Sequence, residues 1–566
     1  MSTENSMRCF VATAVSIVIA VAALLSRSTA DETSALPSAD PGGGFAPFGV
    51  HLSLGTDDDE MVVMWQTLSP AATTVAYGKD STLSMRATGY DKSFVDGGPE
   101  RMVRYIHVVV LRGLEAGVKY YYEVGDPGIQ PGGVSGRFFF HAKRSPSQIA
   151  LSGRPLKILA FGDVGHRKSS DVLALIEKEI HGSGGGGGDG GGVVAMPDML
   201  VHCGDLAYDL DTSNGRNGDA FLRDIEPIAA YIPYMISAGN HERAYNFSHY
   251  ANRFLMPGHG RRTDNHYYSL DIGPLHLVAY NGEAFFWPEY FDVHYLSRMY
   301  DWLEEDLREA NRNRAKTPWI VVHGHRPMYC ALADAPDWPR PDQKGKTLPP
   351  ELRGRCGWEK EAARRGVPSE CSAAFGLDCF PRSESEVAAS YHHVSHTSAL
   401  SSSSSSFSQA RVPPPRTAFP VEKLFYDNGV DLAFFGHVHD YERFFPVYDE
   451  VVRNGTSVTI DAYHEPAATV HVTTGSGGNP EMINIGTLPP ARGPCLREAP
   501  WCAYQSGFAP RGGRTADFTY SRITVHNDST LEWEQMSALE AGAVIDRFFV
   551  ETSKHGSFSG RFDVAS

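Results

Sequence analysis

Five short polar clusters in this chain combine Asp, Asn, His or Tyr with glycine, a pattern that is typical of metal sites. Oxygen and imidazole donors are the ligands that divalent and trivalent metal ions take, and glycine lets the chain turn sharply beside them. A single such residue is more often a turn residue or a hydrogen-bonded core residue, but five clusters in series indicate one site. The clusters are Gly162-Asp163-Val164-Gly165, Gly204-Asp205-Leu206-Ala207-Tyr208, Gly239-Asn240-His241-Glu242, His323-Gly324-His325-Arg326-Pro327 and Gly436-His437-Val438-His439.

Apolar runs precede these clusters and must position them. From about residue 155, strand-like and helical runs alternate, which predicts a mainly parallel, layered α/β sheet with sites beyond the carboxyl ends of its strands. Further β-type runs from about 466 to 535 are expected to complete a second sheet of the same domain. The predicted strands are 157–161, 199–202, 319–322 and 432–435, and the predicted helices are 170–180 and 221–230.

The region before this domain has a different pattern. Residues 47–148 contain short β-type runs with no helical periods between them, which predicts a small antiparallel sandwich. Residues 31–46 are predicted to be a linker, and the runs at 182–192 and 385–412 are predicted to be surface inserts. A phosphate-binding glycine loop is the alternative for the first run, but the Lys and Ser/Thr partners of such a loop are missing. The predicted fold class is α/β, with an all-β domain in front.

Composition limits the functions open to the chain. Its 566 residues suggest three or four structural units, at roughly 150 residues per domain. The hydrophobic share of 42% supports sizeable cores. The formal net charge of −16 argues against broad attraction to nucleic acids or anionic membranes. Any anionic ligand must therefore meet a local site.

The N-terminus has the pattern of a secretory signal. Residues 9–25 carry no charge, and Ser28-Thr29-Ala30 supplies small residues for cleavage after Ala30. The alternative is an uncleaved membrane anchor, since the apolar run is near the lower length limit for a spanning helix. We therefore expect a secreted protein or one of an acidic secretory-pathway compartment. Three sequons fit a glycosylated chain, and they begin at Asn246, Asn454 and Asn527.

The cysteines fit an oxidising compartment. Four of them cluster in one region and two more form a close pair, which predicts disulfides whose connectivity the sequence leaves open. Cys203 lies in an apolar run and is predicted to be a buried thiol. The clustered residues are Cys330, Cys356, Cys371 and Cys379, and the pair is Cys495 and Cys502.

The series of clusters resembles the purple acid phosphatases within the metallophosphoesterase superfamily. Their pattern is Asp-x-Gly, Gly-Asp-x-x-Tyr, Gly-Asn-His-Asp/Glu, Val-x-x-His and Gly-His-x-His, and this chain contains all five in order over about residues 45–550. Tyr208 is the discriminating residue. The resemblance implies a long form, with a fibronectin-like sandwich over 47–148 and a layered α/β/β/α catalytic domain over 153–550. It also implies a C-terminal segment at 466–550 within that domain, followed by a tail at 551–566.

The resemblance further implies two adjacent metal ions. The first would be bound by Asp163, Asp205, Tyr208 and His439, and the second by Asp205, Asn240, His325 and His437. Counting the shared Asp205 as half for each, the first set carries about −2.5 and the second about −0.5 charges. This split favours iron(III) with a divalent iron, zinc or manganese ion. Such a pair can hold a bridging hydroxide as the attacking group, so that no protein nucleophile is needed.

Three assignments depend on the resemblance most. His325 is preferred over His323 as the fourth-motif ligand because Pro327 follows it, and His323 is left as a possible neighbour of the ligands or phosphate contact. His241 is expected to bind phosphate and to help protonate the leaving group, with a purely structural role as the alternative. Glu242 is expected to orient ligands. The plant enzymes carry extra histidines after the fourth motif; Tyr329 to Asp342 contains none, and Asp334 or Asp337 could substitute.

Three functions are consistent with these features. The first is a secreted acid phosphatase that hydrolyses phosphomonoesters. The second is a phosphodiesterase or nucleotide pyrophosphatase with the same metal site, and the third is a non-catalytic surface binding protein. The expected partner is a small phosphate ester, with no nucleic acid, no membrane after signal cleavage, and an oligomeric state that the sequence leaves open.

Overall fold

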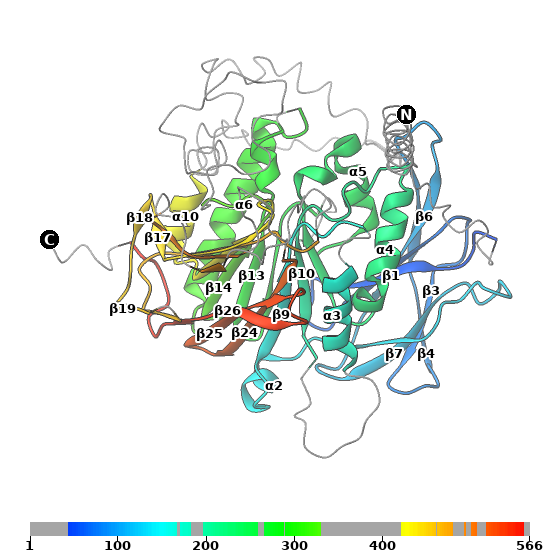
Figure 1. Ribbon diagram of the computed structural model, residues 1–566. Helices are drawn as coiled ribbons and strands as arrows, with labels where there is room; N and C mark the ends of the chain where they lie inside the picture. Colours follow the sequence, from blue (N-terminus) through cyan, green and yellow to red (C-terminus); the bar gives the residue numbers. More distant parts are fainter. Residues whose placement is uncertain are drawn as a thin grey trace, which may run out of the picture.

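The computed structural model describes residues 43–166, 170–182, 196–258, 265–287, 289–329, 420–459, 461–478, 492–493, 500–506 and 517–559. Within these ranges, a smaller β-sandwich is followed by a larger domain with two eight-stranded sheets (Figure 1). The predicted signal peptide, most of the predicted linker and almost all of both predicted inserts lie outside the described residues. The architecture confirms the predicted fold class.

Two four-stranded antiparallel sheets form the N-terminal sandwich, in the orders β1-β2-β6-β5 and β4-β3-β7-β8. Alternating side chains of these strands point into a shared core that includes Trp65, Tyr122 and Phe140, all buried. The strands are β1 (Phe48–Leu54), β2 (Met61–Thr67), β3 (Thr74–Gly78), β4 (Met85–Thr88), β5 (Tyr90–Val95), β6 (Val103–Leu111), β7 (Lys119–Gly125) and β8 (Phe138–His141). A short helix, α2 (Pro146–Leu151), then leads into the second domain.

The first large sheet has the order β11-β10-β9-β24-β25-β26-β20-β19. Its parallel part consists of β9 to β11, whose strands are buried along nearly their whole length. The strands are β9 (Leu156–Phe161), β10 (Met199–Cys203), β11 (Tyr234–Ser237), β19 (Ser457–Val458), β20 (Ala462–His464), β24 (Thr519–Asn527), β25 (Thr530–Ser537) and β26 (Ala543–Glu551).

The second large sheet has the order β12-β13-β14-β15-β21-β16-β23-β22. Strands β13, β14, β15 and β21 run parallel, so their carboxyl ends meet at one edge. The strands are β12 (Tyr268–Ile272), β13 (Leu275–Ala279), β14 (Trp319–His323), β15 (Leu432–Phe435), β16 (Tyr441–Phe444), β21 (Val470–Thr474), β22 (Arg492–Gly493) and β23 (Cys502–Ser506). A small hairpin, β17 (Val447–Tyr448) and β18 (Val451–Val452), lies outside it.

The two large sheets pack face to face and the helices lie on their outer sides (Figure 1). The rings of Phe434 and Trp533 meet across the interface with 5.7 Å between centroids, and Thr474 bonds Ser521 at 2.8 Å. The helices are α3 (Ser170–His181), α4 (Arg216–Ala229), α5 (Ala244–Arg253), α6 (Val293–Arg312) and α10 (Val421–Asn428), with one-turn helices η1 (Asn240–Glu242) and η2 (Gly282–Phe285). This is the predicted α/β/β/α layering.

The C-terminal strands differ from the prediction that they all complete a second sheet. Strand β21 does join the second sheet, beside β15. Strands β24, β25 and β26 instead extend the first sheet, because β24 pairs antiparallel with β9. The reason is that β9 has a neighbour in the parallel run on one side only, so its other edge is open to an antiparallel hairpin.

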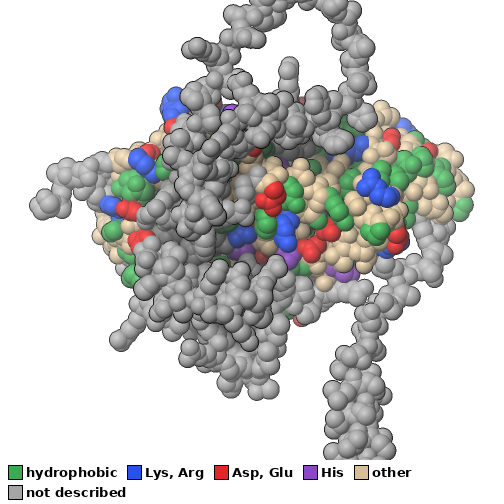
Figure 2. Space-filling view, turned by 90° about the horizontal axis from the view of Figure 1, so that it is seen from above, with side chains coloured by type: hydrophobic (Ala, Val, Ile, Leu, Met, Phe, Trp, Pro, Cys, Tyr) green, Lys and Arg blue, Asp and Glu red, His purple; other side chains and the backbone are tan. Residues whose placement is uncertain are grey.

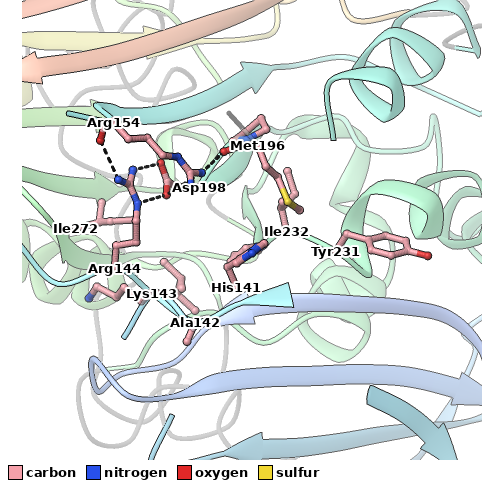
Figure 3. A pocket seen from close by; sticks show the side chains of 14 residues that line it. His141, Ala142, Lys143, Arg144, Arg154, Met196, Asp198, Tyr231, Ile232 and Ile272 are labelled. Atoms are coloured by element: carbon pink, nitrogen blue, oxygen red, sulfur yellow. Dashed lines mark hydrogen bonds and ion pairs between the residues drawn. The ribbon is translucent and has the colours of Figure 1, made fainter. Parts of the chain in front are cut away.

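The sandwich is joined to the larger domain by buried ion pairs. Asp219 on α4 accepts hydrogen bonds from Arg104 of β6 at 2.7 Å and from Arg253 of α5 at 2.8 Å. Arg144 donates two parallel bonds to Asp198, at 2.8 and 2.6 Å (Figure 3). The cavity beside this second pair has a volume of about 30 Å³, too small for a substrate. The interface is therefore a fixed polar contact.

Candidate metal centre

The five predicted clusters meet at the carboxyl ends of the central strands. Asp163 follows β9, Asp205 follows β10 and Asn240 begins η1 after β11. His325 follows β14, and His437 and His439 follow β15. Both large sheets therefore contribute to one site, as parallel strands dictate.

The first group of ligand atoms brings together Asp163, Asp205 and His439, whose donor atoms lie within 4.8 Å of one another. The Tyr208 hydroxyl is 2.8 Å from Asp163 Oδ1 and 3.1 Å from His439 Nε2. All three grouped residues are buried. The phenol thus completes a set of two carboxylates and one imidazole.

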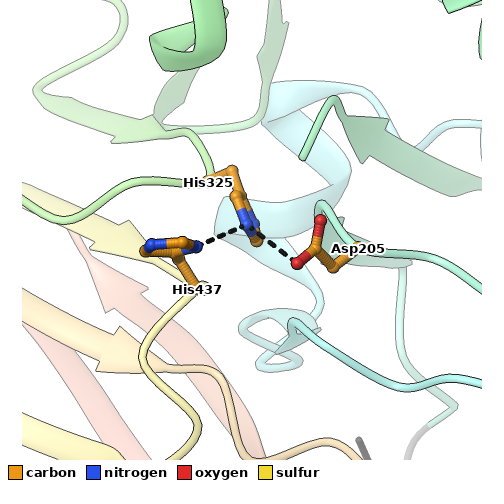
Figure 4. Close-up of side chains that lie close together, drawn as sticks. All are labelled: Asp205, His325 and His437. Carbon is orange, nitrogen blue, oxygen red and sulfur yellow. Dashed lines mark hydrogen bonds and ion pairs between the residues drawn. The ribbon is translucent and has the colours of Figure 1, made fainter. Parts of the chain in front are cut away.

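The second group consists of Asp205, His325 and His437 (Figure 4). His325 Nε2 is 3.2 Å from Asp205 Oδ2 and 3.2 Å from Asn240 Oδ1. His437 Nδ1 approaches the same nitrogen at 3.2 Å. Asp205 belongs to both groups, so the structure places it where a bridging carboxylate would lie.

The tautomer of His325 fits a metal ligand. Its Nδ1 donates to the backbone carbonyl of Cys203 at 2.7 Å, which leaves the Nε2 lone pair directed at the oxygens of Asp205 and Asn240. A ligating histidine is usually oriented in this way through its other ring nitrogen. Four donor atoms with no cation of their own therefore converge on one point, which is the arrangement that a metal ion satisfies.

Backbone conformation holds the ligand loops close together. Asp163, Asp205, Tyr208 and His437 have φ angles between 47° and 69°, the left-handed region that non-glycine residues rarely adopt. Such residues cost about 1–3 kcal/mol each and cluster at functional sites. Gly204, with φ of 79°, allows the His325 ring to approach so closely that a Cβ would lie 2.5 Å from Nδ1.

The charge of Asp205 is retained despite its burial. Burial alone would raise the pKa of this carboxyl, but the neighbouring His325 and His241 hold it well below its usual range. The backbone N–H of His241 also donates to Asp205 Oδ1 at 2.9 Å. An ionised carboxylate is the form that metal ions bind.

His241 lies at the edge of the two groups and is 18% exposed at its side chain. Its Nδ1 is 2.5 Å from Asp209 Oδ1, and its Nε2 is 4.0 Å from Asp205 Oδ2. The Asp209 contact directs Nε2 toward the ligand groups, where a substrate would meet it. The analysis of the sequence did not single out Asp209, although it follows Tyr208 directly.

Glu242 and His323 have different surroundings. Glu242 is buried and accepts backbone hydrogen bonds from Asp205, Leu206 and Gly239 at 2.8–2.9 Å, so it fixes two ligand loops. His323 is fully buried and packs against Phe434 at 5.6 Å between ring centroids. Burial lowers its pKa to about 3, which keeps its ring neutral. Strand β14 ends at His323, so strand alternation does not place its ring beside that of His325.

Other predicted features lie on or outside the described surface. Asn246, Asn454 and Asn527 are all exposed, as glycan acceptors must be. Cys203 is a buried free thiol, whereas the other predicted disulfide cysteines, Cys502 excepted, lie outside the described residues, as do Asp334 and Asp337. Figure 2 shows acidic and basic side chains interspersed on the visible part of one face. Among the described residues, no helix has the length and apolar character needed to cross a membrane.

Comparisons with known proteins agree with this architecture. Residues 47–142 match the N-terminal domain of purple acid phosphatases, residues 156–357 match calcineurin-like phosphoesterases, and residues 468–547 match the family described as "Iron/zinc purple acid phosphatase-like protein C". The solved structure of purple acid phosphatase PPD1 from yellow lupin seeds shares the fold, with a TM-score of 0.58 at 20% identity. That alignment covers 89% of this chain and 74% of the lupin chain.

Full-length relatives extend the match across the whole chain. Acid phosphatase type 7 of Danio rerio is 33% identical, over 91% of this chain and 93% of the relative. The human acid phosphatase type 7 is also 33% identical, over 89% and 91% of the two chains. Purple acid phosphatase 22 of Arabidopsis thaliana is 25% identical, over 78% and 75%.

The two packed sheets, with paired ligand groups at their strand ends, define a metallophosphoesterase. Within that class, the chain belongs to the purple acid phosphatase family, in a form with an N-terminal sandwich. It is accordingly a metal-dependent phosphatase.

Proposed function

We propose that this chain hydrolyses phosphomonoesters at a dinuclear site that takes iron(III) and a divalent iron, zinc or manganese ion. The observation that carries the proposal is the Tyr208 hydroxyl, which lies 2.8 Å from Asp163 Oδ1 and 3.1 Å from His439 Nε2. A phenol has a pKa of about 10, so it binds as phenolate near neutral pH only beside a strongly polarising cation. A trivalent ion in the first group fits this requirement.

The residues around the site have distinct tasks in this proposal. Paired metal ions would supply a nucleophilic hydroxide and the positive charge that stabilises an in-line displacement at phosphorus. Asp205 would hold the two ions together, and Asn240, His325 and His437 would form the less charged second group. His241, oriented by Asp209, would donate a hydrogen bond to the phosphoryl group and a proton to the departing alkoxide.

The test is a visible absorption spectrum of the purified native protein, with metal analysis of the same sample. We expect a broad charge-transfer band and about two metal ions per chain, and we expect the band to disappear in Tyr208→Phe. Tyr90→Phe, at an exposed position on β5, is the matched control and should retain the band. A colourless wild-type protein holding two divalent ions would contradict the assignment of iron(III).

The substrate class is tested on the same metal-loaded sample with p-nitrophenyl phosphate and bis(p-nitrophenyl) phosphate. We expect a higher kcat/KM for the monoester. A clear preference for the diester would instead support the phosphodiesterase function that the sequence leaves open.

We also propose that the protein is secreted or retained in an acidic secretory compartment, with glycans and disulfides. The N-terminal apolar segment and the exposed positions of Asn246, Asn454 and Asn527 support this proposal. Peptide mapping of native protein should find Asp31 as the first residue and mass increments on the three asparagines. A mature chain that retains residues 9–25 would contradict cleavage.

A further inference from the structure

Arg326 directly follows His325 and lies beside the second ligand group. Its side chain is only 12% exposed, and one of its terminal nitrogens, Nη1, is 3.1 Å from His437 Nε2. Its guanidinium carbon lies 4.4 Å from the centroid of the Phe286 ring. The chain therefore places a cation in contact with the outer edge of a predicted metal ligand.

Glu283 fixes the position of this cation. Arg326 Nε donates to Glu283 Oε1 at 2.7 Å, and Trp287 Nε1 donates to Oε2 at 2.9 Å. The Glu283 side chain is fully buried, and its backbone N–H donates to Asn281 Oδ1 at 2.9 Å. A guanidinium anchored through Nε keeps its terminal N–H groups at a fixed edge. Here that edge faces His437.

The contact between Arg326 and His437 has a consequence for the metal-loaded protein. His437 Nδ1 points toward the atoms of the second ligand group, so it is the nitrogen that would bind metal. An imidazole that binds through Nδ1 carries its proton on Nε2. That N–H and the guanidinium N–H would then both be donors 3.1 Å apart, and an acceptor is needed between or beside them.

We propose that Arg326 contacts the phosphoryl group of the substrate and holds it against the second metal site, with Glu283 as the residue that positions the guanidinium. A phosphoryl oxygen is an acceptor that can receive a charge-assisted bond from the guanidinium and a bond from His437 Nε2–H. The same contacts would retain the phosphate product. This inference rests on the proposed function, since it assigns a role at that site.

The test measures binding of inorganic phosphate to the full-length, metal-loaded protein by titration calorimetry. We expect Arg326→Gln to weaken phosphate binding about 10- to 100-fold, with about two metal ions per chain retained. KM should rise more than kcat falls. Arg326→Lys should recover part of the affinity, because lysine keeps the charge but not the planar fork of donors. If the Gln variant does not fold, the Lys variant against wild type carries the test.

Arg223→Gln is the matched control. Its guanidinium carbon also lies over a phenylalanine ring, 3.6 Å from the Phe48 centroid, but it is on α4 at the sandwich interface. Phosphate affinity should be unchanged in this variant.

Two results would overturn the role of Arg326. One is phosphate affinity within twofold of wild type in both Arg326 variants, and the other is loss of metal from Arg326→Gln, which would make the residue a support for His437. These results are distinguishable from failure of the proposed function. A wild-type protein that binds two metals and phosphate but hydrolyses no ester would contradict the function, and the comparison of phosphate affinities would still decide the role of Arg326.

Discussion

Asp209 is the residue that aims His241, and it illustrates how much the ligand groups depend on residues that bind no metal. Its carboxylate meets His241 Nδ1 at 2.5 Å, as the carbonyl of Cys203 meets His325 Nδ1 at 2.7 Å. In both rings, the outer contact fixes the tautomer and directs Nε2 inward. Because Asp209 is 40% exposed, its value lies in orientation more than in buried charge.

We therefore expect Asp209→Asn to reduce kcat about 10-fold, within the 10- to 100-fold range typical of such supporting residues. The amide can still meet the ring but no longer requires the proton on Nδ1. Metal content should stay at the wild-type value, which separates this effect from loss of ligands. The measurement is kcat with metal analysis, and Asp211→Asn, two residues along the same loop, is the control. A kcat equal to wild type would show that His241 needs no such partner.

At this scale, the sequence predicts the ligand types well and their supporting residues poorly. Asp163, Asp205 and His437 are recognisable because each stands beside glycine at the end of an apolar run. Arg326 and Glu283 are 43 residues apart, and only the parallel pairing of β13 with β14 brings them together. Spacing along the chain carries no signal for such a pair.

Among the elements, the hairpin of β12 and β13 is tied to α6 by one histidine. His276 is 2.7 Å from Asp271 through Nδ1 and 3.0 Å from Asp306 of α6 through Nε2. Burial lowers the pKa of His276, but the two carboxylates outweigh it and raise the value to about 9. The ring is thus an imidazolium that joins two elements behind the second sheet.

The raised pKa sets the sign of a pH effect. A group whose folded pKa lies above its ordinary value of 6.5 contributes stability that is complete below 6.5 and is lost as pH rises through about 9. Replacing His276 by Gln should therefore destabilise the protein most near pH 6. The gap in free energy of unfolding should shrink by on the order of 2 kcal/mol toward pH 10, allowing for the half-exposed Asp271.

Denaturant unfolding at several pH values measures this gap. His526→Gln is the control, because His526 is 37% exposed at its side chain and pairs with Glu532 at the surface. A gap for His276→Gln that does not change between pH 6 and pH 10 would contradict the assignment of an imidazolium.

Element type was more predictable than element partner. Apolar runs located β9, β10, β14 and β15 to within a residue or two. Helix α6 was not predicted, although its buried residues, among them Leu296, Met299, Leu303 and Leu307, recur at helical spacing. The assignment of β24 to the first sheet could not be read from alternation, since a period of two identifies a strand but not its neighbour.

For the molecule as a whole, the sandwich and the catalytic domain share a buried polar interface close to the site. Asp96 of the sandwich bonds His249 at 2.8 Å, and Arg253 Nε donates to His249 Nδ1 at 3.2 Å. Both His249 and Arg253 belong to α5, which directly follows the loop that carries Asn240 and His241. Docking of the sandwich thus restrains the helix that supports one edge of the metal centre.

Asp219 is the centre of this interface and carries the largest expected effect. It receives Arg104 through both carboxylate oxygens, at 2.7 and 2.8 Å, and Arg253 at 2.8 Å. Burial opposes its ionisation, but the two arginines hold its pKa below the ordinary value. Asp219→Ala leaves two buried guanidiniums without their carboxylate, which typically costs about 3–5 kcal/mol.

We expect Asp219→Ala to lower the denaturant midpoint accordingly, and to expose the segment between the sandwich and α2 to limited proteolysis. The control is Asp427→Asn, which removes one partner of an exposed pair with Lys423 on α10 and should change stability by less than about 1 kcal/mol. Because the folded pKa of Asp219 is lowered, its contribution is present above the ordinary value of 3.8 and is lost as pH falls through the folded value. The difference between variant and wild type should therefore narrow in acid. If Asp219→Ala unfolds within 1 kcal/mol of wild type near neutral pH, apolar packing of β1 against α4, and not the ion pairs, joins the two domains.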